Sequence, residues 1–231
     1  MRHFFQTMGT VVSLKCPGES LPLVQEVFTH LDELFSLYRE DSEASRMARG
    51  ELRLADASEE AQELYSLAHQ WREATNGAFQ PHRPDGVIDL AGIVKAEAIR
   101  RAGETLERCG ESWLINAGGD VLTSGSGTVG IVDPFDRSGL LSQFATTEDH
   151  PAVATSGTTE RGQHIWRAGS GDEFIQVTVA AHDIITADVL ATAVMSGGAE
   201  TLHQATREHD IQALAVSGDG EILATSAFRK S

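Results

Sequence analysis

A carboxylate and a hydroxyl lie four residues apart in the segment TADVLATA, residues 186–193, inside a long apolar run. Positions i and i+4 of a helix share a face, so Asp188 and Thr192 would point the same way from a helix otherwise suited to burial. One interpretation is structural, with Thr186 capping the helix and Asp188 near the positive end of its dipole. The other is that the two oxygens bind a hard metal ion. Oxygen-only ligands suit Mg²⁺, which accepts one or two carboxylates and keeps its waters.

Two further segments contain a glycine that would let a ligand approach the backbone. In MGT, residues 8–10, the glycine lies in the middle of a predicted strand, where a bulge or a packing contact is the alternative. In IDLAGIVKAEAIRRA, residues 88–102, Gly92 begins a helix and can present a carbonyl to a ligand. Lys95 then lies at the end of that helix where the dipole disfavours a cation, so either a nearby anion accompanies it or the lysine is solvated.

Two more segments hold polar residues that a site could use. NAGGDV, residues 116–121, is typical of a turn. Ser156 follows a predicted strand and precedes His164, which suggests a hydrolase triad with Asp188. Ser156 lacks the G-x-S-x-G pattern of α/β-hydrolases, however, and spacing alone does not establish a triad. No histidine and cysteine pattern indicates zinc.

The order of predicted elements indicates an α+β fold with a mostly antiparallel sheet packed with helices. Helical periodicity predicts helices over residues 21–37, 58–74, 92–109, 186–196 and 199–209, and Ser42 would cap a further short helix. A strand is predicted over residues 3–15, and the second half of the chain holds seven short β-like runs between turn residues. Helices followed by consecutive strands argue against repeated βαβ units. The absence of a linker or repeat predicts a single domain over residues 1–231.

A glycine-rich segment, residues 125–130, matches the dinucleotide-binding pattern G-x-G-x-x-G by its letters. That fingerprint needs a following helix whose N-terminus receives the pyrophosphate. The residues that follow, TVGIVDP, have the character of a strand. We therefore expect a hairpin here.

The net charge of −16 argues against nucleic-acid binding, which needs clustered lysine and arginine. It also means that a phosphate-bearing ligand would need local cations or a metal at its site. No segment approaches the length of a membrane span, and the first residues do not resemble a signal peptide. Two cysteines form no disulfide framework. These features predict a cytoplasmic protein, with a trimmed or short exported chain as the alternative.

Taken together and in order, the motifs resemble those of the ApbE family, the FAD:protein FMN transferases. The matching residues are Met8-Gly9-Thr10, Tyr38 with Asp41-Ser42-Glu43, Thr75-Asn76-Gly77-Ala78-Phe79, Ile88 to Lys95, Ile115 to Asp120, Thr155-Ser156-Gly157, His164-Ile165 and Ala187 to Thr192. Each motif alone is weak, but the ordered series from residue 8 to 192 is specific.

This resemblance implies an ApbE/T-fold-like α+β fold and a Mg²⁺-dependent enzyme. The enzyme would transfer FMN from FAD to a serine or threonine hydroxyl of an acceptor protein through a phosphoester, releasing AMP. Asp188, Thr192 and the carbonyl of Gly92 would bind the metal. His164 would assist proton transfer. The FAD site would be lined by Met8, Tyr38, Ala78, Phe79, Gln80, Asp89 and Lys95. The alternatives are an FAD pyrophosphatase and a protein that binds FAD without turnover.

The sequence departs from the family pattern near the expected flavin site. Gln80 stands where relatives usually carry aspartate, and Ala96 replaces a common glycine. The segment between Phe79 and Ile88 is also shorter than usual.

Overall fold

The fold is built on one long antiparallel sheet. The computed structural model describes residues 1–157 and 173–228. The sheet has eight strands in the order β1-β2-β3-β4-β7-β8-β9-β10, and each neighbouring pair is antiparallel. Its strands are β1 (Arg2–Thr7), β2 (Thr10–Lys15), β3 (Leu114–Ala117), β4 (Asp120–Thr123), β7 (Ala152–Gly157), β8 (Phe174–Ala181), β9 (Gln212–Ser217) and β10 (Ile222–Ala224). The predicted α+β class with a mostly antiparallel sheet is confirmed.

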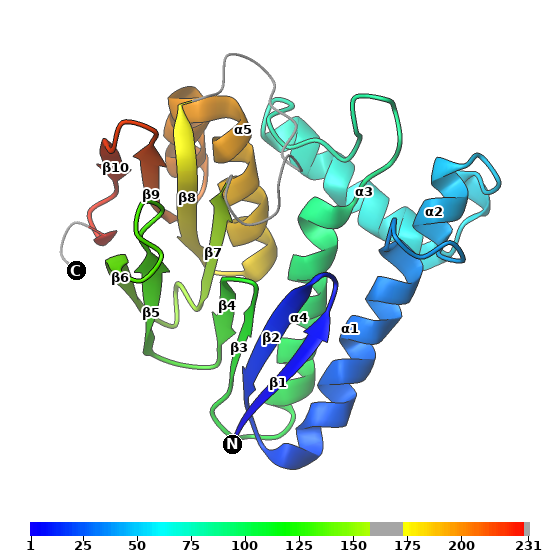
Figure 1. Cartoon of the computed structure of the whole chain (residues 1–231), viewed down its shortest axis with the longest axis horizontal. Coiled ribbons are helices and arrows are strands. Elements are labelled where there is room, and N and C mark those ends of the chain that lie inside the picture. The colour runs from blue at the N-terminus through cyan, green and yellow to red at the C-terminus, as the bar shows by residue number, and fades with distance from the viewer. Residues whose placement is uncertain (158–172, 229–231) are drawn as a thin grey trace.

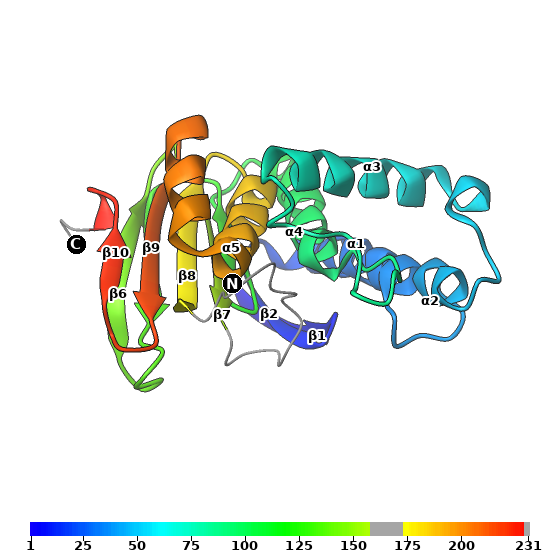
Figure 2. The same cartoon turned by 90° about the horizontal axis from the view of Figure 1, so that it is seen from above.

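Helices α1 (Leu21–Phe35), α4 (Ala91–Glu107) and α5 (Ile184–Glu208) contact one face of this sheet. Helices α2 (Glu43–Ala48) and α3 (Glu59–Ala74) lie beyond the sheet (Figure 2), and the chain also has short 3-10 turns η1 (Gly18–Ser20) and η2 (Leu54–Asp56). Figures 1 and 2 show α5 lying against β7 and β8, and α4 between α5 and α1. The main hydrophobic core fills the space between these helices and the sheet. No described helix has the length and apolar character needed to cross a membrane.

A hairpin covers part of the opposite face. β5 (Gly127–Val132) and β6 (Leu140–Thr146) pair with each other as a separate two-stranded sheet. Their side chains Val129, Ile131 and Phe144 pack in a second core with residues of β4, β7, β8 and β9. The central strands β7 and β8 are therefore buried on both faces and lose the alternation of an exposed strand. The strand expected at TVGIVDP is confirmed as β5, so the dinucleotide pattern, which needs a helix there, is excluded. The turn of the hairpin lies at residues 133–139, however, and not within residues 125–130 as expected.

Helix starts mostly agree with the expected capping residues. Ser42 and Ser58 each accept a hydrogen bond from the backbone N–H three residues later, at the starts of α2 and α3. The prediction that Thr186 caps the following helix is wrong. Asp183 caps α5 by accepting the Thr186 N–H at 2.8 Å, because α5 begins at Ile184, two residues earlier than expected.

Local backbone geometry corrects one further expectation and confirms another. Residues 3–15 are not one strand, because Met8 and Gly9 adopt φ values of 48° and 67° and form the two-residue turn between β1 and β2. The two helices expected at residues 186–196 and 199–209 are both present within α5, separated by a kink where Gly198 has φ 69°. Glu173 accepts the Ala199 N–H at 2.9 Å, which caps the segment after the kink.

Candidate active site

Lys95 occupies the centre of a buried group of charged and hydroxyl side chains where α4, α5, β4 and β7 meet. Its ammonium forms an ion pair with Asp120, and its Nζ lies 3.6 Å from Asp188 Oδ2. On the neighbouring strand, Ser156 Oγ lies 3.1 Å from Thr192 Oγ1. We call these five residues, Lys95, Asp120, Ser156, Asp188 and Thr192, the Lys95 cluster.

Asp120 owes its position to the turn that precedes it. Gly118 and Gly119 have φ values of 61° and 96° and form a two-residue turn between the paired residues Ala117 and Asp120. Asp120 is therefore the first residue of β4, and its Oδ1 accepts the Thr155 N–H of β7 at 3.0 Å. The segment predicted to be a simple turn thus places a fully buried carboxylate beside Lys95.

The i, i+4 pair of α5 has the arrangement expected from its spacing. Asp188 is buried, and Thr192 is half-buried against Ser156. The side chains come from the second and third turns of a helix that is otherwise apolar around them. Whether the pair is structural or binds a metal, Asp188 and Thr192 are polar groups placed in the core. Each of them therefore needs a hydrogen-bond or ion-pair partner.

Lys95 has the nearby anions that its place in the first turns of α4 predicts. Its side chain is 10% exposed, so the alternative of a solvated lysine is wrong. Two carboxylates, from β4 and α5, compensate an ammonium that the helix dipole alone would disfavour.

Gly92 packs closely at the start of α4. A Cβ there would lie 3.1 Å from Cε2 of the buried Phe79 ring. The carbonyl of Gly92 belongs to the first turn of the helix, where carbonyls accept the N–H four residues later. A metal contact at this position would use the second lone pair of that oxygen.

The segment before α4 is fixed by its own contacts. Ala78 and Phe79 have buried side chains, so they can offer a ligand mainly backbone. Gln80 accepts a hydrogen bond from Arg72 Nε at 3.0 Å and donates one to the Gly77 carbonyl at 2.7 Å. Asp89 Oδ1 accepts the Ala91 N–H at 3.0 Å and so shapes the start of α4.

The remaining predicted residues lie apart from the Lys95 cluster or outside the description. Met8 lies in the β1–β2 turn and is partly buried against the core. Tyr38, in the connection between α1 and α2, is 88% exposed. His164 falls outside the described residues. The hypothesis of a hydrolase triad that includes His164 therefore stays untested.

Sequence reasoning did not select Asp120 and Ser156 as site residues. Asp120 stood in a weak turn motif and Ser156 was a rejected nucleophile; both also lie in segments that match the ApbE motifs, but neither was assigned a role. Long-range contacts bring Asp120 and Ser156 close to Lys95 and α5. Local sequence does not reveal these contacts, because β4, β7, α4 and α5 meet only in the folded chain.

The cluster is chemically suited to a hard cation and to phosphate oxygens. It offers carboxylate and hydroxyl oxygens together with one ammonium. In residues 1–157 and 173–228, no three histidine, cysteine, aspartate or glutamate side chains gather as a metal site. A cation held by few protein oxygens completes its shell with water or phosphate, which is the habit of Mg²⁺. Two surface hollows, of about 320 and 430 Å³, are lined by other residues.

Comparison with known proteins gives one family. The sequence model of the ApbE family matches residues 8–84 and 81–215. A curated relative, the FAD:protein FMN transferase of Klebsiella pneumoniae (strain 342), is 32% identical over 162 residues, which are 64% of this chain and 51% of the relative. The chain thus spans about half the length of the curated relative it matches.

Solved structures agree with the fold. The ApbE protein of Thermotoga maritima has a TM-score of 0.84 at 21% identity, covering 100% of this chain and 98% of that one. The flavinyl transferase ApbE of Pseudomonas stutzeri, in its apo form, has a TM-score of 0.79 at 21% identity, covering 100% and 95%. The flavin transferase ApbE of Vibrio cholerae gives 0.77 at 20% identity, covering 100% and 98%. The match of the family model over most of the residues places this chain in the ApbE family.

Proposed function

We propose that this protein transfers FMN from FAD to a serine or threonine hydroxyl of an acceptor protein, with Mg²⁺ bound, and releases AMP. The observation that carries the proposal is the Lys95 cluster, which gathers hydroxyl and carboxylate oxygens and an ammonium in a member of the ApbE family. The name of the Klebsiella relative supports FAD as donor and a protein as acceptor.

The residues of α4 and α5 would hold the metal. In the proposal, the carboxylate of Asp188, the hydroxyl of Thr192 and the carbonyl of Gly92 are its protein ligands. Bound Mg²⁺ would neutralise the charge that develops on the pyrophosphate. Ser156 keeps the Thr192 hydroxyl oriented through their contact of 3.1 Å.

The flavin dinucleotide would lie between the predicted FAD residues and the cluster. Met8, Tyr38, Ala78, Phe79, Gln80, Asp89 and Lys95 are proposed to line its site. In the transfer, the acceptor oxygen bonds to the FMN phosphorus, the bond from that phosphorus to the bridging oxygen breaks, and AMP leaves. His164 is proposed to take the hydroxyl proton, since histidine is the side chain that most often serves as a general base.

The test is incubation of the protein with FAD and Mg²⁺, with and without a threonine-containing acceptor peptide. AMP that appears only with the peptide, together with flavin covalently bound to it, supports the transferase. AMP and free FMN without acceptor indicate the pyrophosphatase, and intact retained FAD indicates a binding protein. The predicted cytoplasmic location stays a prediction.

A further inference from the structure

Strand β1 lies at one end of the long sheet, and among the described strands only β2 pairs with it (Figure 1). The backbone nitrogen of Met1 donates to the Cys16 carbonyl at 3.1 Å, and the Cys16 N–H donates to the Met1 carbonyl at 3.2 Å. Backbone groups alternate in direction along an antiparallel pair. Those of Arg2, Phe4 and Gln6 therefore point away from β2 and form a free edge.

This edge has little of the protection that a free strand usually carries. β1 has six residues, contains no proline and pairs with β2 without a bulge. At the opposite end of the sheet, β10 has three residues, so its short length limits pairing. The edge of β1 is therefore suited to the addition of a strand from another polypeptide.

The side chains beside this edge are basic and apolar. Arg2 and Lys15 are exposed and lie opposite each other in the register of β1 and β2. Phe4 is 66% exposed and Val11 is 49% exposed. These residues share one face of the hairpin with the exposed Gln6. We call Arg2, Phe4, Gln6, Val11 and Lys15 the edge surface.

The edge surface is positive in a strongly acidic chain. Residues 1–18 contain no aspartate or glutamate, although the net charge of the chain is −16. Like charges in directly opposite positions of two strands repel each other. In residues 1–157 and 173–228, no ion pair joins Arg2 or Lys15 to a carboxylate. Acidic side chains of a partner would relieve this repulsion, so the charge favours an acidic partner.

A second copy of this chain fits the edge surface less well. Paired through its own β1, it would bring another Arg2 and Lys15 to the same place, and no carboxylate from residues 1–18. The repulsion would increase instead of being relieved. The charges therefore favour a different protein as the partner.

The other end of the edge leads to the proposed flavin site. β1 ends at Thr7, and the turn that follows holds Met8, which is proposed to line the FAD site. A hollow of about 430 Å³ at this turn is lined by Gln6, Thr7, Gly9, Thr10 and Val11. A strand added to β1 would run for roughly 20 Å between the two cations and this hollow.

We propose that the acceptor protein docks on the free edge of β1 as an extended acidic segment. Its carboxylates lie beside Arg2 and Lys15, its apolar side chains contact Phe4, and its serine or threonine lies toward the Met8 turn. Hydrogen bonds to the outward backbone groups of β1 hold the segment in place. This inference rests on the proposed function, because it takes the protein to act on an acceptor protein.

The first test is a charge exchange, measured by fluorescence anisotropy with the full chain and without FAD or Mg²⁺. The probe is a labelled peptide of alternating threonine and valine with glutamates at one end, and its counterpart carries lysines there. We expect Arg2→Glu/Lys15→Glu to bind the glutamate peptide at least about tenfold more weakly than the wild type. The same variant should bind the lysine peptide at least about tenfold more tightly than the wild type does.

The matched control is Arg53→Glu/Arg207→Glu. It makes the same change in net charge at two exposed arginines outside the edge surface. We expect its affinity for the glutamate peptide to stay within about threefold of the wild type, because distant exposed charges are screened. A loss equal to that of Arg2→Glu/Lys15→Glu would make the effect one of net charge and overturn the proposal.

The second test asks whether the peptide pairs with the backbone of β1. Gln6→Pro removes an outward N–H and keeps the hydrogen bonds to β2, whereas Gln6→Ala shortens the side chain alone. We expect Gln6→Pro to bind the glutamate peptide at least about fivefold more weakly, and Gln6→Ala to change its affinity by less than about twofold. Should Gln6→Pro not fold, peptides N-methylated at one or the other set of alternate amides carry the test on the wild type, since only one set faces β1.

Several outcomes overturn the proposal: no binding of the glutamate peptide by the wild type, affinities unchanged by the charge exchange, or equal binding by Gln6→Pro and Gln6→Ala. A dimer seen by sedimentation and dissociated by Gln6→Pro would make the edge an interface between copies of this chain.

Transfer of FMN to the glutamate peptide separates this proposal from the proposed function. Transfer that the charge reversal leaves unchanged would contradict docking on β1 while the transferase activity stands. Binding at the edge with no transfer would contradict the proposed function, and with it the acceptor as the occupant of the edge. Because anisotropy is measured without FAD, its failure is distinct from failure to form AMP and FMN.

Discussion

At the scale of single residues, the proposed metal site depends on two side-chain oxygens of α5, those of Asp188 and Thr192. Their spacing of four residues predicts a shared face, and the structure places Asp188 against Lys95 and Thr192 against Ser156. The spacing could not predict that Lys95 and Ser156 are the partners of these two side chains. The expectation of an anion near Lys95 is confirmed, but Asp120 reaches it from a strand 25 residues further along the chain.

The first prediction concerns Asp188. We expect Asp188→Asn to lower the Mg²⁺-dependent formation of AMP from FAD by at least about 100-fold, since it removes the carboxylate ligand. Lys95 keeps its ion pair with Asp120 in this variant, so the fold is retained. Rates measured across a range of Mg²⁺ concentrations check this, with circular dichroism as the control for folding. Wild-type activity in the variant would remove Asp188 from the metal site.

The second prediction concerns His164. As the proposed proton acceptor, His164→Ala should lower kcat by about 100-fold and change the Kd for FAD by less than about threefold. Single-turnover transfer to an acceptor peptide measures the first, and quenching of flavin fluorescence measures the second. Equal losses in both would make His164 a binding residue.

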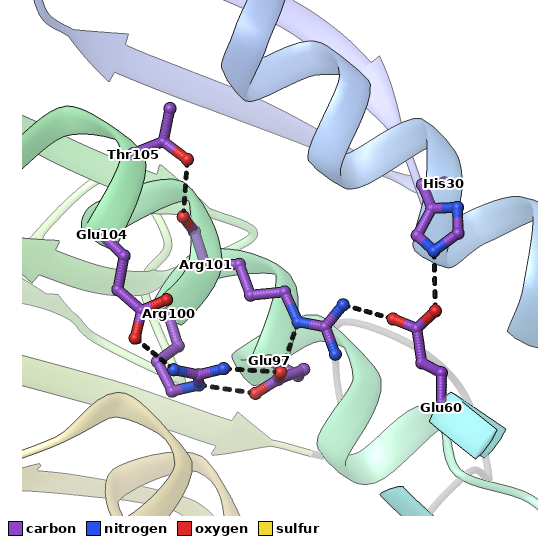
Figure 3. A network of polar contacts seen from close by, with 7 residues as sticks. All are labelled: His30, Glu60, Glu97, Arg100, Arg101, Glu104 and Thr105. Atoms are coloured by element: carbon purple, nitrogen blue, oxygen red, sulfur yellow. Dashed lines mark hydrogen bonds and ion pairs between the residues drawn. The ribbon is translucent and has the colours of Figure 1, made fainter. Parts of the chain in front are cut away.

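At the scale of elements, a network of charges fastens α4 to α3 and α1. Glu97 accepts hydrogen bonds from Arg100 and Arg101, and Arg101 also pairs with Glu60 of α3 (Figure 3). Glu60 in turn lies 2.7 Å from His30 Nε2 of α1. The network keeps in place the helix that carries both Gly92 and Lys95.

The third prediction is a pH dependence of stability that comes from Glu97. Burial alone would raise the pKa of Glu97, but hydrogen bonds from Arg100 and Arg101 outweigh burial and hold that pKa below its ordinary value. A pKa lowered by folding stabilises the protein fully above the unfolded pKa, about 4.3, and less as the pH falls through the folded pKa. The contribution of Glu97 should therefore disappear in acid.

Urea unfolding of Glu97→Gln tests this. We expect a loss of about 1–3 kcal/mol in the free energy of unfolding at pH 7, where the charge-assisted hydrogen bonds are intact. The difference from the wild type should shrink below about pH 4. The control is Glu104→Gln, whose side chain is 54% exposed and which should change stability by less than about 0.5 kcal/mol. A pH-independent difference for Glu97→Gln would contradict the prediction.

Helices could be predicted from the sequence where their own residues carried all the necessary signals. The serine caps of α2 and α3 and the helical periodicity of α4 were sufficient because these signals lie within the elements themselves. The turn at Met8 was missed because methionine is rare at a positive φ, and only Gly9 carried the expected turn signal. Strand order could not be predicted, since it depends on contacts between distant segments.

At the scale of the whole molecule, the net charge opposes the proposed substrate. A chain of charge −16 repels the pyrophosphate of FAD, and the Lys95 cluster supplies one ammonium among carboxylates. In the proposed function, a bound Mg²⁺ joins this ammonium as the local cation that a phosphate ligand needs.

The fourth prediction follows from that charge. Raising the ionic strength from about 10 to about 100 mM shortens the Debye length from about 30 to about 10 Å and screens the repulsion. At fixed free Mg²⁺, we expect the KM for FAD to fall by about twofold or more while kcat stays constant. Steady-state rates in KCl check this. A KM that rises with salt would indicate an attractive basic surface at the site.

The most direct test of the central claim is a crystal structure of the protein with FAD and Mn²⁺ in place of Mg²⁺, located by its anomalous signal. We predict a cation peak about 2.2 Å from both the Asp188 carboxylate and the Thr192 hydroxyl, in contact with the FAD pyrophosphate. A cation and pyrophosphate bound elsewhere, with Asp188 still beside Lys95, would contradict the account.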